Sequence, residues 1–300
     1  MKYLITGAAG FIGQHLCRIL AVQGHAVTGV DIKPRPNGFQ GNFYQDTILD
    51  LPRMSTLADE CDGIFHLAAI ASVTKTIEAP LSTRTTNVTG TQNMLEAARQ
   101  NGNIPFVYAS SAAVYGDTPT LPLKETLDGR PLSPYAEHKL ANETDAKAYG
   151  TTHGLPSFGL RFFNLYGTGQ DPTSPYSGVI SIFHQKLGAG EPLMMFGDGT
   201  QTRDFVFIDD AIAGLISSLA HANPQAPVCN VCTGQQTSLL TLAETLGNIM
   251  HIKPDIHFQP ARAGDIRHSC GDPAYFKTLT GFIPKTPLKE GLKALLKPNA

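Results

Sequence analysis

The first 165 residues alternate short apolar runs with segments in which apolar residues return every three or four positions. The runs at 2–7, 26–31, 63–68, 104–110 and 157–164 have the length and composition of buried strands. Between them the apolar positions form stripes along one helix face, as in Ile12, Leu16, Ile19 and Leu20 or Val88, Met94, Leu95 and Ala98. This alternation predicts an α/β fold, a doubly wound parallel sheet covered by helices on both faces.

The alternation breaks after Asn164. Residues 165–178 are rich in glycine and proline, and strand-like runs return at 205–209 and 228–234 among helical segments. We therefore predict a first domain formed by 1–165 plus about 204–232. A smaller C-terminal lobe is predicted from about 166–203 plus 233–300.

Charge and composition argue against two classes of binding partner, nucleic acids and membranes. The 300 residues carry a net charge of -2 with 16% charged residues and no lysine or arginine block, which is atypical of proteins that bind nucleic acid or an anionic membrane. The chain starts directly in a strand pattern rather than in a signal peptide, and no run of 18 apolar residues occurs. These features predict a cytoplasmic protein with neither type of partner.

The five cysteines agree with a reducing compartment because they are odd in number and lack the spacing of a disulfide framework. Cys229 and Cys232 form a C-x-x-C pattern, but the residues around them alternate like a strand. No second cysteine or histidine pair stands at ligand spacing. We interpret both as core thiols and predict no metal site.

Three glycines mark a dinucleotide site. Gly7, Gly10 and Gly13 lie where the first predicted strand turns into the first helix, which suits a tight turn and close approach of a pyrophosphate to the helix N-terminus. Asp31 ends the second strand, where an acid can bind a ribose 2′-hydroxyl and repels a 2′-phosphate. The pattern predicts a Rossmann-type site for NAD rather than NADP. A plain structural turn and a surface aspartate are the alternatives.

Tyr135 and Lys139 form the candidate proton-transfer pair. Four residues apart on a helix, they share one face. A close ammonium, together with the positive nicotinamide ring, is expected to lower the pKa of the phenol and make it a usable base. The alternative is an ordinary exposed helix pair. Ser111 ends an earlier strand, at the sheet edge where ligands bind in such folds.

Eight segments in chain order carry a resemblance that covers nearly the whole chain. They read TGAAGFIG (6–13), FHLAA (65–69), NVTGTQNMLEAA (87–98), SSAAVYG (110–116), YAEHK (135–139), RFFNLYG (161–167), GDGTQTRDFVFIDD (197–210) and GDIRHS (264–269). Together they resemble the extended short-chain dehydrogenase/reductase family, in particular its nucleotide-sugar epimerases and dehydratases. One segment departs from the family pattern. In the family an aspartate shortly after the third strand contacts the adenine, and here either Asp46 or Thr47 could stand at that position.

The resemblance implies the site residues. The catalytic residues would be Ser111, Tyr135 and Lys139. The cofactor contacts would be Gly7, Gly10, Phe11, Ile12, Gly13, Asp31, Asp46, Thr47, Leu67, Ala68, Ala69, Asn87, Ser110, Tyr135, Lys139 and Phe163. The substrate contacts would be Ala71, Ser72, Ser111, Asn164, Ser177, Gly178, Arg203, Arg262, Asp265 and Ser269. Among these, the arginines suit a diphosphate because their planar guanidinium binds its oxygens in pairs. His66 is interpreted as a structural histidine.

Two alanines narrow the expected reaction. Relatives that eliminate water, decarboxylate or epimerise at other carbons carry an acid, base or nucleophile where this chain has Ala112 and Ala113, which exchange no side-chain proton. The resemblance then implies an NAD-dependent UDP-hexose 4-epimerase that works through a transient 4-keto sugar. It also implies a homodimer, which is the usual state in this family. The small Ser269 leaves room for N-acetylated UDP-sugars. The alternatives are a nucleotide-4-ketosugar reductase, an epimerase of UDP-glucuronate or of a dTDP- or GDP-sugar, and a binding protein without turnover.

Overall fold

The computed structural model describes residues 1–170, 178–261 and 266–296. The chain divides into two compact units, each described separately below. Unit 1 comprises Met1–Val114, Pro131–Arg161 and Ile212–Cys229. Unit 2 comprises Tyr115–Arg130, Phe162–Ala211 and Asn230–Ala300.

A seven-stranded sheet in the order β11-β6-β5-β4-β1-β2-β3 forms the centre of the fold. Its strands are β1 (Lys2–Thr6), β2 (Ala26–Asp31), β3 (Asn42–Gln45), β4 (Gly63–His66), β5 (Phe106–Ser111), β6 (Ser157–Phe162) and β11 (Val228–Val231). The pairs β1/β2, β1/β4, β2/β3 and β4/β5 are parallel. The strand order reverses beside β1, and ligands of such sheets bind outside the carboxyl ends of the strands at that point.

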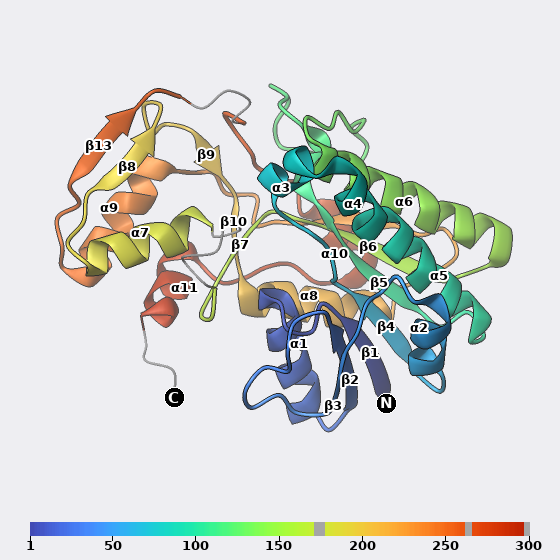
Figure 1. The fold of residues 1–300 in the computed structure, drawn as a ribbon. Coiled ribbons are helices and arrows are strands. Elements are labelled where there is room, and N and C mark those ends of the chain that lie inside the picture. Colours follow the sequence, from blue (N-terminus) through green and yellow to red (C-terminus); the bar gives the residue numbers. More distant parts are fainter. Residues whose placement is uncertain (171–177, 262–265, 297–300) are drawn as a thin grey trace. The chain divides into compact units, whose positions relative to one another are not determined.

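Helices cover both faces of this sheet (Figure 1). On one face, Leu4 of β1 and Phe106 of β5 share a buried core with residues of α2 (Leu51–Ala58), α5 (Gly90–Gln100) and α6 (Pro134–His153). On the other face lie α1 (Phe11–Val22) and α8 (Ile208–Leu219), where Gly63 packs against Leu219. The predicted doubly wound α/β fold is confirmed.

Three short helical segments follow β4 and one follows β5. They are α3 (Val73–Glu78), α4 (Pro80–Arg84), the π-helical turn Thr85–Thr89 and the 3-10 turn Ala112–Tyr115. A π-helical turn inside a helix is frequent at functional sites because it re-aims one side chain. Here the turn carries Asn87.

Unit 2 is built from small strand pairs and helices. The pairs are β7 (Asn164–Tyr166) with β10 (Phe205–Phe207), β8 (Leu193–Phe196) with β13 (Ile256–Gln259), and β9 (Thr202–Arg203) with β12 (Thr237–Ser238). Its helices are α7 (Val179–Gly188), α9 (Leu239–Met250), α10 (Ala274–Thr280) and α11 (Leu288–Leu295). The segment Tyr115–Arg130 belongs to this unit because Leu123 pairs with Cys270 and Asp272, and Glu125 accepts from the Asn230 N–H.

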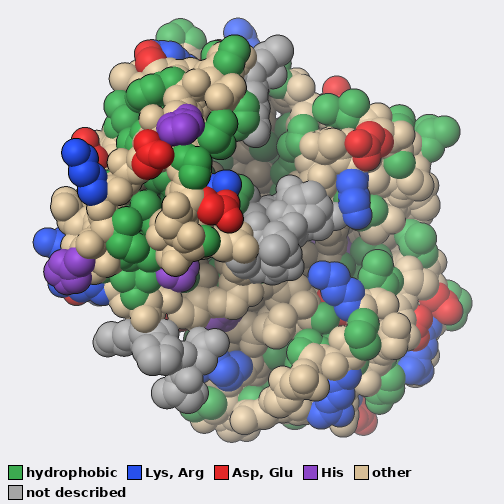
Figure 2. Space-filling model, turned by 60° about the vertical axis from the view of Figure 1, so that its left-hand side comes forward, with side chains coloured by type: hydrophobic (Ala, Val, Ile, Leu, Met, Phe, Trp, Pro, Cys, Tyr) green, Lys and Arg blue, Asp and Glu red, His purple; other side chains and the backbone are tan. Residues whose placement is uncertain are grey.

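Charged side chains of both signs are interspersed on the face shown in Figure 2, in line with the small net charge. Across the described residues, the helices are too short or too polar to cross a membrane. The five cysteines are free thiols and all are buried.

Candidate active site

The turn between β1 and α1 is shaped by glycine. Gly7 has a φ of +71°, and a Cβ there would lie 2.8 Å from the backbone nitrogen of Ala68. A Cβ at Gly13 would lie only 2.1 Å from the carbonyl oxygen of Gly7. Gly10 is the N-cap of α1 and makes no side-chain capping hydrogen bond. The N–H groups of Phe11 and Ile12, in the first turn, therefore have no partner within the helix. This backbone cradle fits a pyrophosphate.

Asp31 lies beside this cradle at the end of β2. Its carboxylate accepts hydrogen bonds from the Ala9 N–H at 3.0 Å and from the Lys33 N–H at 2.9 Å, one on each oxygen. Each oxygen keeps a further lone pair for a ribose hydroxyl. The two candidates for the adenine contact directly follow the neighbouring strand β3, where the Asp46 N–H donates to the carbonyl of Asp31 and the Asp46 carboxylate accepts from the Thr47 N–H.

The segment after β4 packs against the glycine turn. The Leu67 N–H donates to the carbonyl of Thr6, and the side chain of Asn87 holds Ile70 by two hydrogen bonds, accepting from its N–H at 2.7 Å and donating to its carbonyl at 3.0 Å. Asn87 therefore fixes the loop that contains Leu67, Ala68 and Ala69. Together with Asp31 and the glycine turn, this loop fits a dinucleotide.

His66 belongs to a buried hydrogen-bond chain. Thr91 donates to the carbonyl of Asn87 at 2.8 Å, so the His66 Nε2–H donates to Thr91 Oγ1 at 3.0 Å while Nδ1 accepts from Thr6 Oγ1 at 2.8 Å. Burial, aided by the charge of Lys139, lowers the pKa of His66 to about 3. The ring is neutral with both nitrogens satisfied, which confirms its interpretation as a structural histidine.

The three predicted catalytic residues meet at the end of β5. Ser111 is the last residue of that strand, and its hydroxyl accepts from the Ala113 N–H at 3.2 Å. It is near enough to Tyr135, in the first turn of α6, to lower the pKa of the phenol. Lys139 lies one turn further along α6, with its ammonium 5.8 Å from the centre of the Tyr135 ring. The same ammonium donates to the carbonyl oxygen of Ala109 at 2.7 Å.

The start of α6 explains the placement of Tyr135. Ser133 caps the helix by accepting from the Ala136 N–H at 3.3 Å, and Pro134 takes the first helical position, where its missing N–H costs nothing. Tyr135 and Lys139 then point to one side because they are four residues apart.

Burial sets the protonation of this pair. It raises the pKa of the Tyr135 phenol, against a smaller lowering by the hydrogen bond with Ser111, and it lowers the pKa of Lys139 to about 8. The lower phenol pKa that we expected from the spacing is therefore not found in the protein alone. Because burial disfavours the charged form and raises the pKa of the phenol above its ordinary value, the phenol is neutral at neutral pH in the protein alone.

Ser110 points away from this group. Its hydroxyl donates to Glu143 at 2.5 Å, and Glu143 accepts from Nε and Nη2 of Arg161 at 2.9 and 2.7 Å. The hydroxyl is thus engaged in a buried ion pair, and its contact with a cofactor remains a prediction. Sequence reasoning missed Glu143 and Arg161, although Glu143 stands one helical turn after Lys139.

Of the predicted substrate contacts in unit 1, Ser72 is buried and caps α3 by accepting from the Lys75 N–H at 3.1 Å. Ala71 precedes it and is exposed. The Ser72 hydroxyl thus accepts a hydrogen bond within α3 and keeps its own proton to donate. Its role toward a substrate remains a prediction.

Unit 2 brings Arg203 and Ser269 close together. Arg203 ends β9, and the Ser269 N–H donates to the carbonyl of the preceding Thr202 at 3.1 Å. The other predicted residues of this unit begin short elements: Asn164 opens β7 directly after Phe163, and Gly178 caps α7. Ser177, Arg262 and Asp265 lie outside the described residues.

Asp204, which sequence reasoning also missed, explains how Arg203 is held. It is completely buried and accepts from the Thr233 N–H and hydroxyl, the Gly234 N–H and the Gly271 N–H. Four donors compensate for the burial of one carboxylate, although burial still raises its pKa. Asp204 therefore anchors the strand end that carries Arg203.

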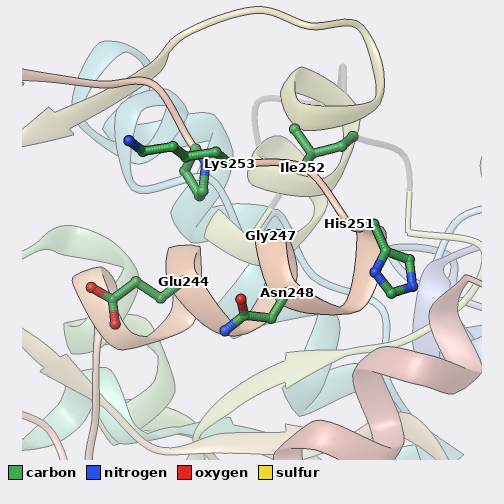
Figure 3. A pocket seen from close by; sticks show the side chains of 7 residues that line it. Glu244, Gly247, Asn248, His251, Ile252 and Lys253 are labelled. Carbon is green, nitrogen blue, oxygen red and sulfur yellow. The ribbon is translucent and has the colours of Figure 1, made fainter.

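A hollow of about 440 Å³ also lies at the end of α9 (Figure 3). It is lined by Glu244, Gly247, Asn248, His251, Ile252, Lys253 and Pro254. None of the predicted site residues contributes to it. The candidate site is therefore the carboxyl edge of the sheet in unit 1.

The glycine turn and Asp31 are features of a dinucleotide-dependent enzyme, and the Tyr135–Lys139 pair is its candidate proton-transfer pair. The chain belongs to the NAD dependent epimerase/dehydratase family, whose model matches residues 3–232. The resemblance in the sequence is thereby confirmed, and the enzyme is NAD-dependent.

Individual relatives are similar over nearly their full length. A UDP-glucose 4-epimerase of Mycolicibacterium smegmatis is 35% identical, covering 97% of this chain and 96% of its own. A Thermotoga maritima UDP-glucose 4-epimerase, solved with UDP-glucose, has a TM-score of 0.93 at 32% identity over 98% and 97% of the two chains.

Two further solved structures differ in substrate. A UDP-N-acetylglucosamine 4-epimerase of Methanobrevibacter ruminantium has a TM-score of 0.92 at 31% identity, covering 98% of this chain and 96% of its own. A UDP-glucuronic acid 4-epimerase of Bacillus cereus, solved with UDP-glucuronic acid and NAD, has a TM-score of 0.88 at 32% identity, covering 98% and 97%.

Proposed function

We propose that this protein is a UDP-hexose 4-epimerase that interconverts UDP-glucose and UDP-galactose and accepts their N-acetylated forms. The observation that carries the proposal is the meeting of Ser111, Tyr135 and Lys139 at the end of β5, followed at once by two alanines. The relatives named above, each of them a 4-epimerase of a UDP-sugar, support it.

The glycine turn, Asp31 and the loop held by Asn87 would hold NAD. When bound, NAD supplies the acceptor and donor of the hydride that leaves and returns to C4 of the sugar. Asp31 selects NAD because its two oxygens already receive backbone donors and its negative charge repels a 2′-phosphate.

Tyr135 is the proton carrier in this mechanism. As the phenolate, its Oη takes the proton of the sugar 4-hydroxyl, and in the second half of the reaction it returns that proton to the C4 oxygen. Ser111, which lowers the pKa of that phenol, would hold the same sugar oxygen. The Lys139 ammonium stabilises the phenolate. Each proton removed is returned, so the enzyme is restored after every turnover.

Ala112 and Ala113 limit the reaction to this step. They occupy the 3-10 turn directly after Ser111 and offer no acid, base or nucleophile. Water elimination and decarboxylation need such a group beside the sugar ring. The 4-keto sugar therefore has no route other than hydride return, to either face.

The N-acetyl tolerance rests on Ser269, which is small and lies beside Arg203, the proposed diphosphate ligand. The similarity to a UDP-glucuronic acid 4-epimerase makes UDP-glucuronate the second candidate substrate. A ketosugar reductase that uses NADPH is disfavoured by Asp31. The homodimer and the cytoplasmic location remain predictions from the resemblance and the composition.

The test is incubation of the pure protein with UDP-glucose, UDP-N-acetylglucosamine and UDP-glucuronate separately, followed by proton NMR of the sugar. We expect the galacto epimer to appear with the first two. Conversion of UDP-glucuronate alone would shift the assignment to the second candidate. Loss of water or CO₂, or no change with any of the three, would refute the proposal.

A further inference from the structure

A buried ion pair lies directly behind the catalytic residues. The side chains of Glu143 on α6 and Arg161 on β6 are 7% and 8% exposed and are joined by two hydrogen bonds of 2.7 and 2.9 Å. Removing two charges from water is costly, and a hydrophobic pair of the same volume often stabilises a protein as well. The pair therefore calls for a reason beyond stability.

Its position suggests that reason. Along α6, Tyr135, Lys139 and Glu143 follow one another at intervals of one turn and share one face. Lys139 binds the carbonyl of Ala109, and Glu143 binds the hydroxyl of Ser110. Two successive turns of the catalytic helix are thus attached to two successive residues of β5, and the next residue of that strand is Ser111.

Arg161 completes the attachment. Its guanidinium holds both oxygens of the Glu143 carboxylate, which fixes the rotation of that group and aims one oxygen at Ser110. Because Arg161 lies on the neighbouring strand, the contact joins β5, β6 and α6 at one point. Ser111 can act on the Tyr135 phenol, whose pKa it lowers, only while β5 and α6 keep this spacing.

We propose that Glu143, held by Arg161, is a positioning residue for the epimerase reaction: through Ser110 it holds Ser111 against Tyr135, and its charge faces the Lys139 ammonium. This inference rests on the proposed function. A shift of about 1 Å between reacting groups lowers the rate up to about 100-fold, so such an attachment matters although Glu143 touches neither substrate nor cofactor.

The effect of the Glu143 charge on the pKa of Lys139 has a direction that can be measured. Burial lowers the pKa of Lys139 to about 8, and the negative charge of Glu143 opposes that lowering. The other titratable groups near Lys139 are Tyr135, His66 and His138. Loss of the Glu143 charge should therefore lower the pKa of Lys139 further.

The first experiment uses Ser110→Ala, which leaves the ion pair intact. We expect its kcat to fall about 10-fold with KM for the UDP-sugar within about twofold, and Ser110→Thr to recover most of the loss because it restores the hydroxyl. The matched control is Thr144→Ala, an exposed neighbour of Glu143 that bonds only within α6. An unchanged kcat in Ser110→Ala, with active wild type, would overturn the proposal.

The second experiment does not depend on turnover. In NAD-free protein labelled at lysine Cε, ¹³C NMR follows the titration of Lys139, assigned by its loss in Lys139→Met. The double variant Glu143→Gln with Arg161→Met removes both charges and keeps an amide oxygen for Ser110, so no unpaired buried charge remains. A lower pKa of Lys139 supports the proposal and an unchanged pKa overturns it. Wild type that converts no UDP-sugar refutes the proposed function, and this titration then decides alone.

Discussion

The Lys139 ammonium donates a 2.7 Å hydrogen bond to the backbone carbonyl of Ala109. The contact holds α6 against the end of β5, so the helix that carries the proposed base lies beside the strand that ends in Ser111. Burial, the largest cause acting on the Tyr135 phenol, raises its pKa in this setting.

Tyr135→Phe should abolish proton transfer while keeping the fold. We expect kcat to fall by about 100- to 10,000-fold, the usual contribution of a positioned acid or base, with NAD content unchanged. Turnover is measured by NMR and bound NAD by release on denaturation. Tyr149→Phe, on the same helix, is the control and should stay active. Residual activity near wild type in Tyr135→Phe would exclude it as the base.

Gly13→Ala should disrupt the cofactor turn. The added methyl would lie 2.1 Å from the Gly7 carbonyl oxygen, so the turn must move, and we expect a loss of about 2 kcal/mol in the free energy of unfolding. Bound NAD should fall sharply. Gly188→Ala is a helical control with room for a methyl and should cost nothing. Equal NAD content in both variants would contradict the assigned cradle.

The acid stability of the protein should depend on His66. The pKa of His66 is about 3 in the folded state and 6.5 in the unfolded state. Below pH 6.5 the unfolded state therefore binds an extra proton, and the stability of the folded state decreases as the pH is lowered. At about pH 5 the loss from this group is about 2 kcal/mol. Urea unfolding of His66→Gln should show a correspondingly flatter dependence between pH 7 and about pH 5.

The exposed His221 provides the matching control. His221→Gln should keep the pH dependence of the wild type. If His66→Gln also keeps it, His66 is not buried in the neutral form.

Ser269→Tyr should reduce activity on the N-acetylated UDP-sugar more than on UDP-glucose. A bulky tyrosine in place of the small, buried Ser269 is expected to lower kcat/KM for UDP-N-acetylglucosamine about 10-fold or more, and to change kcat/KM for UDP-glucose by less than about threefold. Ser269→Ala, which adds no bulk, should leave both unchanged. Equal losses on the two substrates in Ser269→Tyr would refute the role of Ser269 in selection.

The local features of the fold could be predicted because each is determined by a short stretch of chain. The strands β1, β2, β4, β5 and β6, the glycine turn and the four-residue spacing of Tyr135 and Lys139 all follow from periodicity and helix geometry, whereas the short strand β3 was not predicted. Asn87 was expected near the cofactor end, and the structure shows it holding Ile70.

Long-range polar contacts could not be predicted in the same way. Glu143 and Arg161 are 18 residues apart on a helix and a strand, and Asp204 meets its donors about 30 and 67 residues later. Nothing local marks these partners. The raised pKa of Tyr135 was missed for the same reason, since burial depends on the packing of the whole unit.

The central claim is inversion at C4 with return of the same hydrogen, and it is tested by running the reaction in D₂O. The protein is incubated with UDP-glucose, UDP-N-acetylglucosamine or UDP-glucuronate, and the C4 hydrogen of the product is read by proton NMR. We predict a 4-epimer that still carries protium at C4. A product with deuterium at C4, or no 4-epimer from any of the three, would contradict the account.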